Sequence, residues 1–154
     1  MKIRLLCIPF FLMVSSCTLL EKNYENGLLA SNNSKYEEAI GHFSRAIQNN
    51  PKFGSAHFQR ALAKFETKNY KGAIEDFRYA IDYNSDEDAA RYNIALCYQR
   101  MSMYAQSIVE YKKCVKLCKS YRQKVSSHIR VAEIYNNQVG TKKRVFNKVC
   151  QFRI

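Results

Sequence analysis

A tyrosine-led pattern recurs at a constant interval in this 154-residue chain, and it constrains the fold more than any other feature. The copies begin at Tyr36, Tyr70 and Tyr104. In each copy, small or aliphatic residues follow at offsets of three, four, ten and eleven, and an aromatic residue follows at an offset of seven. A period of about 34 residues predicts a repeat architecture, in which each copy is one supersecondary unit.

The spacing within one copy is helical. Tyr36, Ala39, Phe43 and Ala46 fall on one stripe of a helix, where the two alanines let a neighbouring helix approach closely. A second apolar stripe lies upstream of each copy and carries a small residue at Gly27, Ala61 and Ala95, which are separated by the same interval. Each unit is therefore expected to be a helix A, a turn and a helix B. Because neither helix can bury its stripe alone, the units must stack.

These residues resemble the tetratricopeptide (TPR) repeat family. The resemblance is carried by the small residue of helix A, the Tyr that opens helix B, the Ala-x-x-x-Phe core and the closing Pro51. It implies an all-α, right-handed TPR helical-hairpin solenoid with a C-terminal capping helix. The chain departs from the family pattern at Ser107, Cys114 and Lys119 in the third copy. It also departs where an aromatic residue is expected early in helix A, at Asn23, His57 and Arg91.

The period divides the chain into segments. We expect TPR units at 20–53, 54–87 and 88–121, and a capping helix at 122–136 that ends in the run Asn136–Gly140. The remaining basic segment, 137–154, is interpreted as a degenerate helix B of a fourth repeat, as a basic amphipathic segment, or as a frayed tail. At the helix starts, Ser34 and Glu37 predict a capping box, and Asn69 is expected to cap its helix B.

The N-terminus predicts export and lipidation. Residues 1–16 read as a lipoprotein signal peptide, with Lys2 and Arg4 before a short apolar core. The sequence Val14-Ser15-Ser16-Cys17 resembles a bacterial lipobox, so Cys17 is the expected lipidation site and 17–19 the lipidated N-terminus. An ordinary secretory signal and a plain membrane anchor are the alternatives. Thr18, in place of an aspartate, implies the outer membrane, facing the periplasm.

Charge is distributed unevenly. Residues 17–111 hold 11 Lys/Arg and 12 Asp/Glu, whereas residues 112–154 hold 12 Lys/Arg and one acid, Glu133. This basic lobe, represented by Lys142, Lys143, Arg144 and Lys148, is either a solvated face or an electrostatic dock for an acidic protein, anionic lipid or cell-wall polymer. Export argues against nucleic acid as a partner.

No catalytic constellation is present. His42, His57 and His128 share no spacing, and no metalloprotease, nucleophile-elbow or phosphate-loop motif occurs, so we predict no enzyme, no cofactor and no metal. Four cysteines remain in the expected oxidising compartment. A Cys97–Cys114 or a Cys118–Cys150 disulfide is an open alternative, and Cys114 is expected to pack in the core because it replaces an alanine.

The resemblance places partner binding on helix A, which lines the concave groove of TPR arrays. The implied groove residues are Tyr24, Leu28, Phe58, Gln59, Leu62, Phe65, Tyr92, Asn93, Leu96 and Arg100. Such an aromatic and aliphatic groove suits an extended peptide or an amphipathic helix, although some of these side chains are alternatively expected to pack within the stack. The family's carboxylate clamp is missing, since its places hold Tyr24, Leu28, Gln59, Ala89 and Asn93.

The sequence therefore predicts a membrane-anchored interaction scaffold of the bacterial envelope that binds another envelope protein. The alternative is a cell-wall or anionic-lipid-associated factor that acts through the basic lobe. The oligomeric state stays open.

Overall fold

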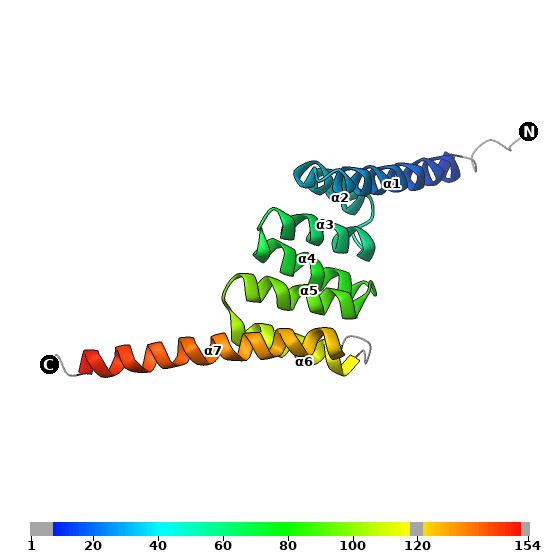
Figure 1. The fold of residues 1–154 in the computed structure, drawn as a ribbon. Coiled ribbons are helices and arrows are strands. Elements are labelled where there is room, and N and C mark those ends of the chain that lie inside the picture. Colours follow the sequence, from blue (N-terminus) through cyan, green and yellow to red (C-terminus); the bar gives the residue numbers. More distant parts are fainter. Residues whose placement is uncertain (1–7, 118–121, 152–154) are drawn as a thin grey trace, which may run out of the picture. The chain divides into compact units, whose positions relative to one another are not determined.

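A computed structural model describes residues 8–117 and 122–151, with side chains described for 19–115 and 125–140. Over these residues the chain forms seven helices and no strand, which confirms the all-α prediction (Figure 1). No helix among them is long and apolar enough to cross a membrane. The chain divides into two compact units, unit 1 (Met1–Asp86) and unit 2 (Glu87–Ile154).

Unit 1 contains two helical hairpins. They are formed by α1 (Ile8–Asn32), α2 (Tyr36–Asn49), α3 (Gly54–Glu66) and α4 (Tyr70–Asp82). Within each hairpin the two helices pack along one another, and α2 also packs on α3. Phe43 and Phe77, which the repeat pattern places at equivalent positions of consecutive units, are both fully buried. Buried alanines at Ala39, Ala46, Ala73 and Ala80 flank them, as the helical stripe predicts.

The helices α1 and α2 approach one another closely at Gly27. A Cβ atom added there would lie 2.5 Å from Cε1 of Phe43, well inside van der Waals contact. This contact explains why the repeat pattern requires a small residue in helix A. At the two corresponding positions, Ala61 and Ala95 are fully buried.

Unit 2 contains α5 (Glu87–Arg100), α6 (Tyr104–Leu117) and α7 (Arg122–Gln151). Its core joins all three helices, because Ala95, Tyr111, Cys114 and Val125 form one buried cluster. The helix α7 corrects a prediction, since we expected a break at Asn136–Gly140 and the helix continues to Gln151. No proline interrupts this stretch, and a glycine inside a helix costs only about 1 kcal/mol.

The turns between helices share one geometry. Ser34, Lys68, Asn84 and Ser102 are the described non-glycine residues with positive φ, between 55° and 63°. At Lys68 the backbone amide donates to the Phe65 carbonyl oxygen at 3.0 Å, and the next amide donates to the Lys64 carbonyl oxygen at 2.8 Å. This pair of bonds is a Schellman motif, which satisfies carbonyl groups at a helix C-terminus. Three of the four residues, Ser34, Lys68 and Ser102, are again separated by the repeat interval.

Of the two helix caps predicted from the sequence, the structure contains only one. The predicted capping box at Ser34 and Glu37 is wrong. Ser34 adopts the left-handed conformation that ends α1, and the N-cap of α2 is Lys35, without a side-chain cap. The Asn69 cap is confirmed, since its Oδ1 accepts a hydrogen bond of 3.1 Å from the amide of Gly72.

Candidate functional site

Helix A side chains of consecutive hairpins meet in unit 1. The Tyr24 side chain on α1 is hydrogen-bonded to Gln59 on α3. Burial raises the pKa of Tyr24, and the hydrogen bond to Gln59 opposes that rise. The Tyr24 ring also lies 4.9 Å from Phe53 and 5.8 Å from Phe43 between ring centroids. Two of the predicted groove residues therefore lie on one face, which we call the helix-A face.

The other predicted groove residues of unit 1 are half-buried. Leu28 packs on the cluster around Phe43. Phe58 meets the ring of Phe77 edge-on at 5.4 Å, and Phe65 meets the ring of Tyr70 in the same way at 5.4 Å. Leu62 is half-buried on the same helix, α3. The side chains of Phe58 and Phe65 therefore pack within the second hairpin, in agreement with the alternative that some of these residues pack within the stack.

In unit 2 the helix A residues meet α7. Tyr92 lies 5.8 Å from both Tyr111 and His128, and its hydroxyl is 3.3 Å from Nε2 of His128. Leu96 packs on the core cluster of this unit. Asn93 donates a hydrogen bond of 2.9 Å to the Ala89 carbonyl oxygen of its own helix, and Arg100 is exposed at the end of α5. Tyr92 and Leu96 are thus part of the packing around α7.

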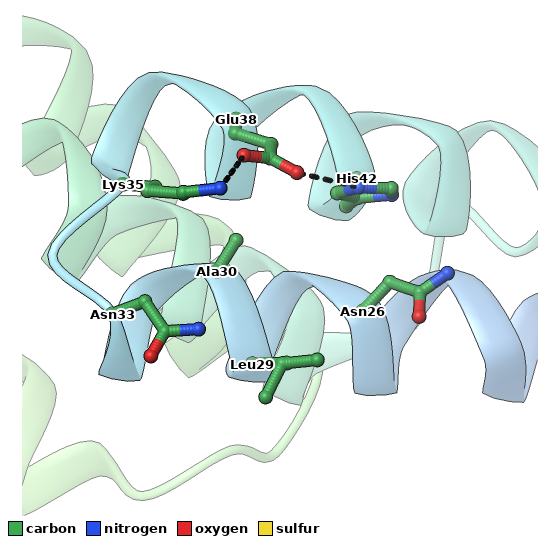
Figure 2. A pocket seen from close by; sticks show the side chains of 7 residues that line it. All are labelled: Asn26, Leu29, Ala30, Asn33, Lys35, Glu38 and His42. Atoms are coloured by element: carbon green, nitrogen blue, oxygen red, sulfur yellow. Dashed lines mark ion pairs between the residues drawn. The ribbon is translucent and has the colours of Figure 1, made fainter.

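A hollow of about 310 Å³ lies elsewhere on unit 1, between α1 and α2. Figure 2 shows its lining and the ion pairs above it, where Glu38 bridges Lys35 at 3.4 Å and His42 at 3.9 Å. The lining residues are Asn26, Leu29, Ala30, Asn33, Lys35, Glu38 and His42. None of them was predicted as a groove residue.

The repeat explains this hollow. In the next hairpin, the positions equivalent to Asn26 and Leu29 are Arg60 and Ala63, and α2 covers both. Arg60 donates a hydrogen bond of 3.1 Å to Ser44 on α2, and Ala63 belongs to the cluster around Phe43. The hollow therefore corresponds to the surface on which, in the next hairpin, helix B of the preceding repeat packs.

Sequence reasoning missed a buried ionic cluster beside α3. The Asp76 side chain is only 3% exposed and contacts Arg60 at 2.7 Å and Lys64 at 2.8 Å. The Nδ1 atom of His57 lies 3.7 Å from Oδ1 of Asp76, and its Nε2 donates to the Pro51 carbonyl oxygen at 2.9 Å.

Unit 2 repeats this arrangement at the equivalent positions of the next repeat, where Arg91 pairs with Glu110 at 3.3 Å and also with Glu87 at 2.7 Å. The sequence does contain a sign of these ion pairs. His57 and Asp76 are separated by the same number of residues as Arg91 and Glu110.

The cysteines of the core are free thiols. Cys97 and Cys114 are fully buried and unbonded to each other, so the structure does not contain the Cys97–Cys114 disulfide. The buried packing role of Cys114 is confirmed. Burial raises the pKa of the Cys97 thiol to about 12, which keeps it protonated and unreactive at neutral pH. No group of side chains that could hold a metal ion occurs among the described residues.

Several predicted sites fall outside the described side chains. Cys17 lies on the backbone of α1 and Lys142, Lys143, Arg144, Lys148 and Cys150 lie on the backbone of α7, but their side chains are outside the described residues, as is Cys118. Lipidation, the basic lobe and the Cys118–Cys150 disulfide therefore stay predictions.

Two sequence profiles, each described as a tetratricopeptide repeat, match residues 24–89 and 89–121. The chain belongs to the tetratricopeptide repeat family. Its curated relatives include the Hsp70-Hsp90 organising protein of Plasmodium falciparum, 36% identical over 86 residues, and the peptidyl-prolyl cis-trans isomerase FKBP42 of Arabidopsis thaliana, 35% identical over 83 residues. These matches cover 51% and 53% of this TPR chain but only 15% and 23% of the relatives.

Solved structures share the TPR fold. The first TPR domain of Spaghetti (RPAP3) bound to an HSP90 peptide has a TM-score of 0.68 at 18% identity, covering 75% of this chain and 91% of that one. The Yersinia enterocolitica type III secretion chaperone SycD, in complex with a peptide of the translocator YopD, has a TM-score of 0.70 at 17% identity, covering 76% and 94%. MamA from Desulfovibrio magneticus has a TM-score of 0.70 at 20% identity, covering 86% and 74%.

Proposed function

We propose that this TPR protein is a non-catalytic adaptor that binds a segment of a partner protein on its helix-A face. The observation that carries the proposal is the contact of Tyr24 on α1 with Phe53 at the start of α3 and with Gln59 on α3, because it brings helix A side chains of consecutive repeats onto one surface. That surface combines half-buried aromatic and aliphatic groups with an amide, a composition suited to an extended or helical peptide. The peptide complexes of SycD and of Spaghetti (RPAP3) show that the shared fold can hold a partner segment.

The partner segment differs from a chain terminus held by its carboxylate. The positions that form a carboxylate clamp in chaperone-binding TPR domains hold Tyr24, Leu28 and Gln59 in unit 1, none of which is cationic. A free carboxylate bound there would lose its hydration without gaining a charged partner, which is costly. We therefore propose an internal apolar segment as the ligand.

We further propose that the adaptor is lipid-anchored in the bacterial envelope, most simply at the outer membrane facing the periplasm. The lipobox-like sequence ending at Cys17 supports the lipid anchor, and Thr18 in place of an aspartate supports the outer membrane. Acyl chains hold a protein at a membrane through buried methylene groups, at about 0.8 kcal/mol for each. In this location the partner would be another envelope protein.

Site-specific photocrosslinking in intact cells tests the binding face. A photoreactive amino acid at Leu62 should give a discrete adduct, which mass spectrometry then identifies. The matched control is the same amino acid at Leu29, which is 62% exposed on α1 beside the hollow. Adduct at position 29 and none at position 62 would move the binding site to the hollow. Alanine substitutions of Phe58 and Tyr92 would test the binding face less clearly than crosslinking, because both side chains also stabilise the fold.

Metabolic labelling tests the anchor separately. Cells fed labelled palmitate should incorporate the label into the wild-type protein, and the label should be absent from a Cys17→Ser variant. The N-terminal peptide of the mature protein should begin at a modified Cys17. An unmodified mature N-terminus at another residue would show an ordinary secretory signal instead.

A further inference from the structure

The middle of α7 carries large apolar side chains that the described helices of unit 2 leave exposed. Val131, Ile134, Tyr135 and Val139 are 41%, 52%, 47% and 54% exposed. Elsewhere on the same helix, Val125 and Ala132 are fully buried, and Val125 belongs to the core cluster.

These four side chains share one side of α7, which we call the α7 stripe. At about 100° for each residue of a helix, the four side chains lie within an arc of about 140°, and the stripe extends for about 12 Å along the axis. Tyr135 at its centre also stacks on Tyr104 of α6, with 5.2 Å between ring centroids. Glu133 is two residues from both Val131 and Tyr135, which places it on the opposite side of the helix.

The charge of α7 restricts what can cover the stripe. Between Arg122 and Gln151 the sequence holds seven Lys/Arg and one acid, Glu133. Arg130, next to the stripe, is exposed. A second copy of the chain would bring the same excess of positive charge against α7 and would be repelled. The complementary occupant is therefore anionic.

We propose that the α7 stripe lies on an anionic lipid surface, with the apolar side chains at the level of the acyl chains and the basic residues among the headgroups. A helix with an exposed apolar side and an excess of basic residues in its sequence has the features of an interfacial amphipathic helix. Tyr135 has an amphipathic ring, which suits the boundary between headgroups and acyl chains. An acidic helix of a protein is the other occupant that this charge allows, and it is one of the outcomes of the test below. This inference does not depend on the helix-A face.

A fluorescence experiment on the full chain tests the proposal. The chain contains no tryptophan, so a single substitution Val139→Trp supplies a reporter at the end of the stripe that is blind to the N-terminal anchor. With vesicles of phosphatidylglycerol and phosphatidylcholine, its emission should shift to shorter wavelength, and brominated lipid should quench it. The matched control is Val109→Trp, where the replaced side chain is 52% exposed on α6, and its emission should stay unchanged.

A second substitution tests whether the α7 stripe inserts into the lipid or only lies near the vesicle surface. In a Cys17→Ser background, which lacks the proposed lipid anchor, adding Ile134→Glu to Val139→Trp should weaken vesicle binding about tenfold, because it removes an aliphatic side chain that would lie in the lipid and adds a negative charge. Val109→Glu should have no effect, and circular dichroism should show equal helix content in all variants. Raising the salt concentration should weaken binding, since exposed charges are screened.

Three outcomes would overturn the proposal. The first is an unchanged emission with anionic vesicles, and the second is an equal shift with pure phosphatidylcholine. The third is a shift produced by poly-glutamate or by raising the protein concentration without vesicles, which would identify an acidic protein segment or a second copy as the occupant.

Discussion

Arg60 on α3 donates two hydrogen bonds to Asp76 on α4, at 2.8 Å from Nε to Oδ2 and 2.7 Å from Nη2 to Oδ1. The same guanidinium donates a third bond to Ser44 on α2. One cation therefore connects three consecutive helices of unit 1. The Asp76 carboxylate is nearly inaccessible to solvent, and its two hydrogen bonds fix its position relative to the Arg60 guanidinium.

Replacement of Asp76 by asparagine should destabilise the protein by about 2 kcal/mol, because it leaves Arg60 and Lys64 without their shared counter-ion. The expected loss is smaller than that for a fully buried ion pair, since Arg60 and Lys64 retain some contact with water. Urea unfolding followed by circular dichroism measures the change. Glu38→Gln, in the exposed Lys35–Glu38 pair, is the control and should change stability by less than about 0.5 kcal/mol. Equal losses in both variants would contradict the buried role.

The same carboxylate predicts a pH dependence. Burial alone would raise the pKa of Asp76, but hydrogen bonds and charge from Arg60 and Lys64 outweigh burial and lower it. A depressed pKa in the folded state contributes stability above the unfolded value of 3.8 and loses it as the pH falls through the folded pKa. The difference in unfolding free energy between wild type and Asp76→Asn should therefore be constant from about pH 7 to 5 and should shrink below about pH 4. A constant difference down to pH 2 would show that Asp76 acts without its charge.

Gly27 and Gly41 should respond oppositely to alanine. Gly27→Ala should destabilise by about 2 kcal/mol, because the new methyl group would overlap the buried ring of Phe43. Gly41→Ala should stabilise by about 0.5–1 kcal/mol, because nothing lies near its Cβ position on α2 and alanine favours the helix. Thermal unfolding of the two variants gives the comparison. A stabilised Gly27→Ala protein would show that α1 and α2 are farther apart than described.

Lys68 occupies a conformation that glycine adopts more easily. Lys68→Gly should stabilise by about 0.5–1 kcal/mol, since the relief of left-handed strain exceeds the entropic cost of glycine. Lys71→Gly inside α4 is the matched control and should destabilise by about 1 kcal/mol. Chemical denaturation measures both. A loss of stability in both variants would mean that the turn at Lys68 is unstrained.

Ser107 is fully buried, and within the described residues its hydroxyl has no hydrogen-bond partner. Ser107→Ala should therefore stabilise by about 1 kcal/mol, because it removes an unsatisfied polar group at a position where the repeat favours alanine. Ser44→Ala is the informative contrast, since the Ser44 hydroxyl donates to the Ile40 carbonyl oxygen at 2.7 Å and accepts from Arg60. It should lose stability. If the unfolding midpoints of Ser107→Ala and Ser44→Ala shifted in the same direction, the missing hydrogen bond of Ser107 would not explain its effect on stability.

The fold was predictable because the constant repeat period fixes both the helix stripes and the small residue at which they touch. Phe43 and Phe77 are central in the structure for the same reason that they are periodic in the sequence. The cap at Ser34 was misread, since serine is common both before a helix and in a left-handed turn after one. The continuity of α7 was missed because asparagine and glycine lower helix propensity without forbidding a helix.

The candidate site was predictable in outline only. Helical spacing and the family pattern identified Tyr24 and Gln59, which do share a face. They left open which of the groove residues pack within the stack, because the contacts of Phe58 and Tyr92 depend on Phe77 and His128 from other helices. The ionic cluster around Asp76 was missed for a similar reason, since ion pairs between helices leave only a weak trace in a single sequence.

The order of packing within each unit has a consequence for how the protein is made. Within each unit the described helices pack mainly on their neighbours in the sequence, as α1 does on α2 and α5 does on α6. Contacts between neighbours in sequence form early, because little chain entropy must be lost to bring them together. The hairpin of α1 and α2 can therefore close while α3 is still being synthesised. The hairpins of unit 1 can form in the order in which they leave the ribosome.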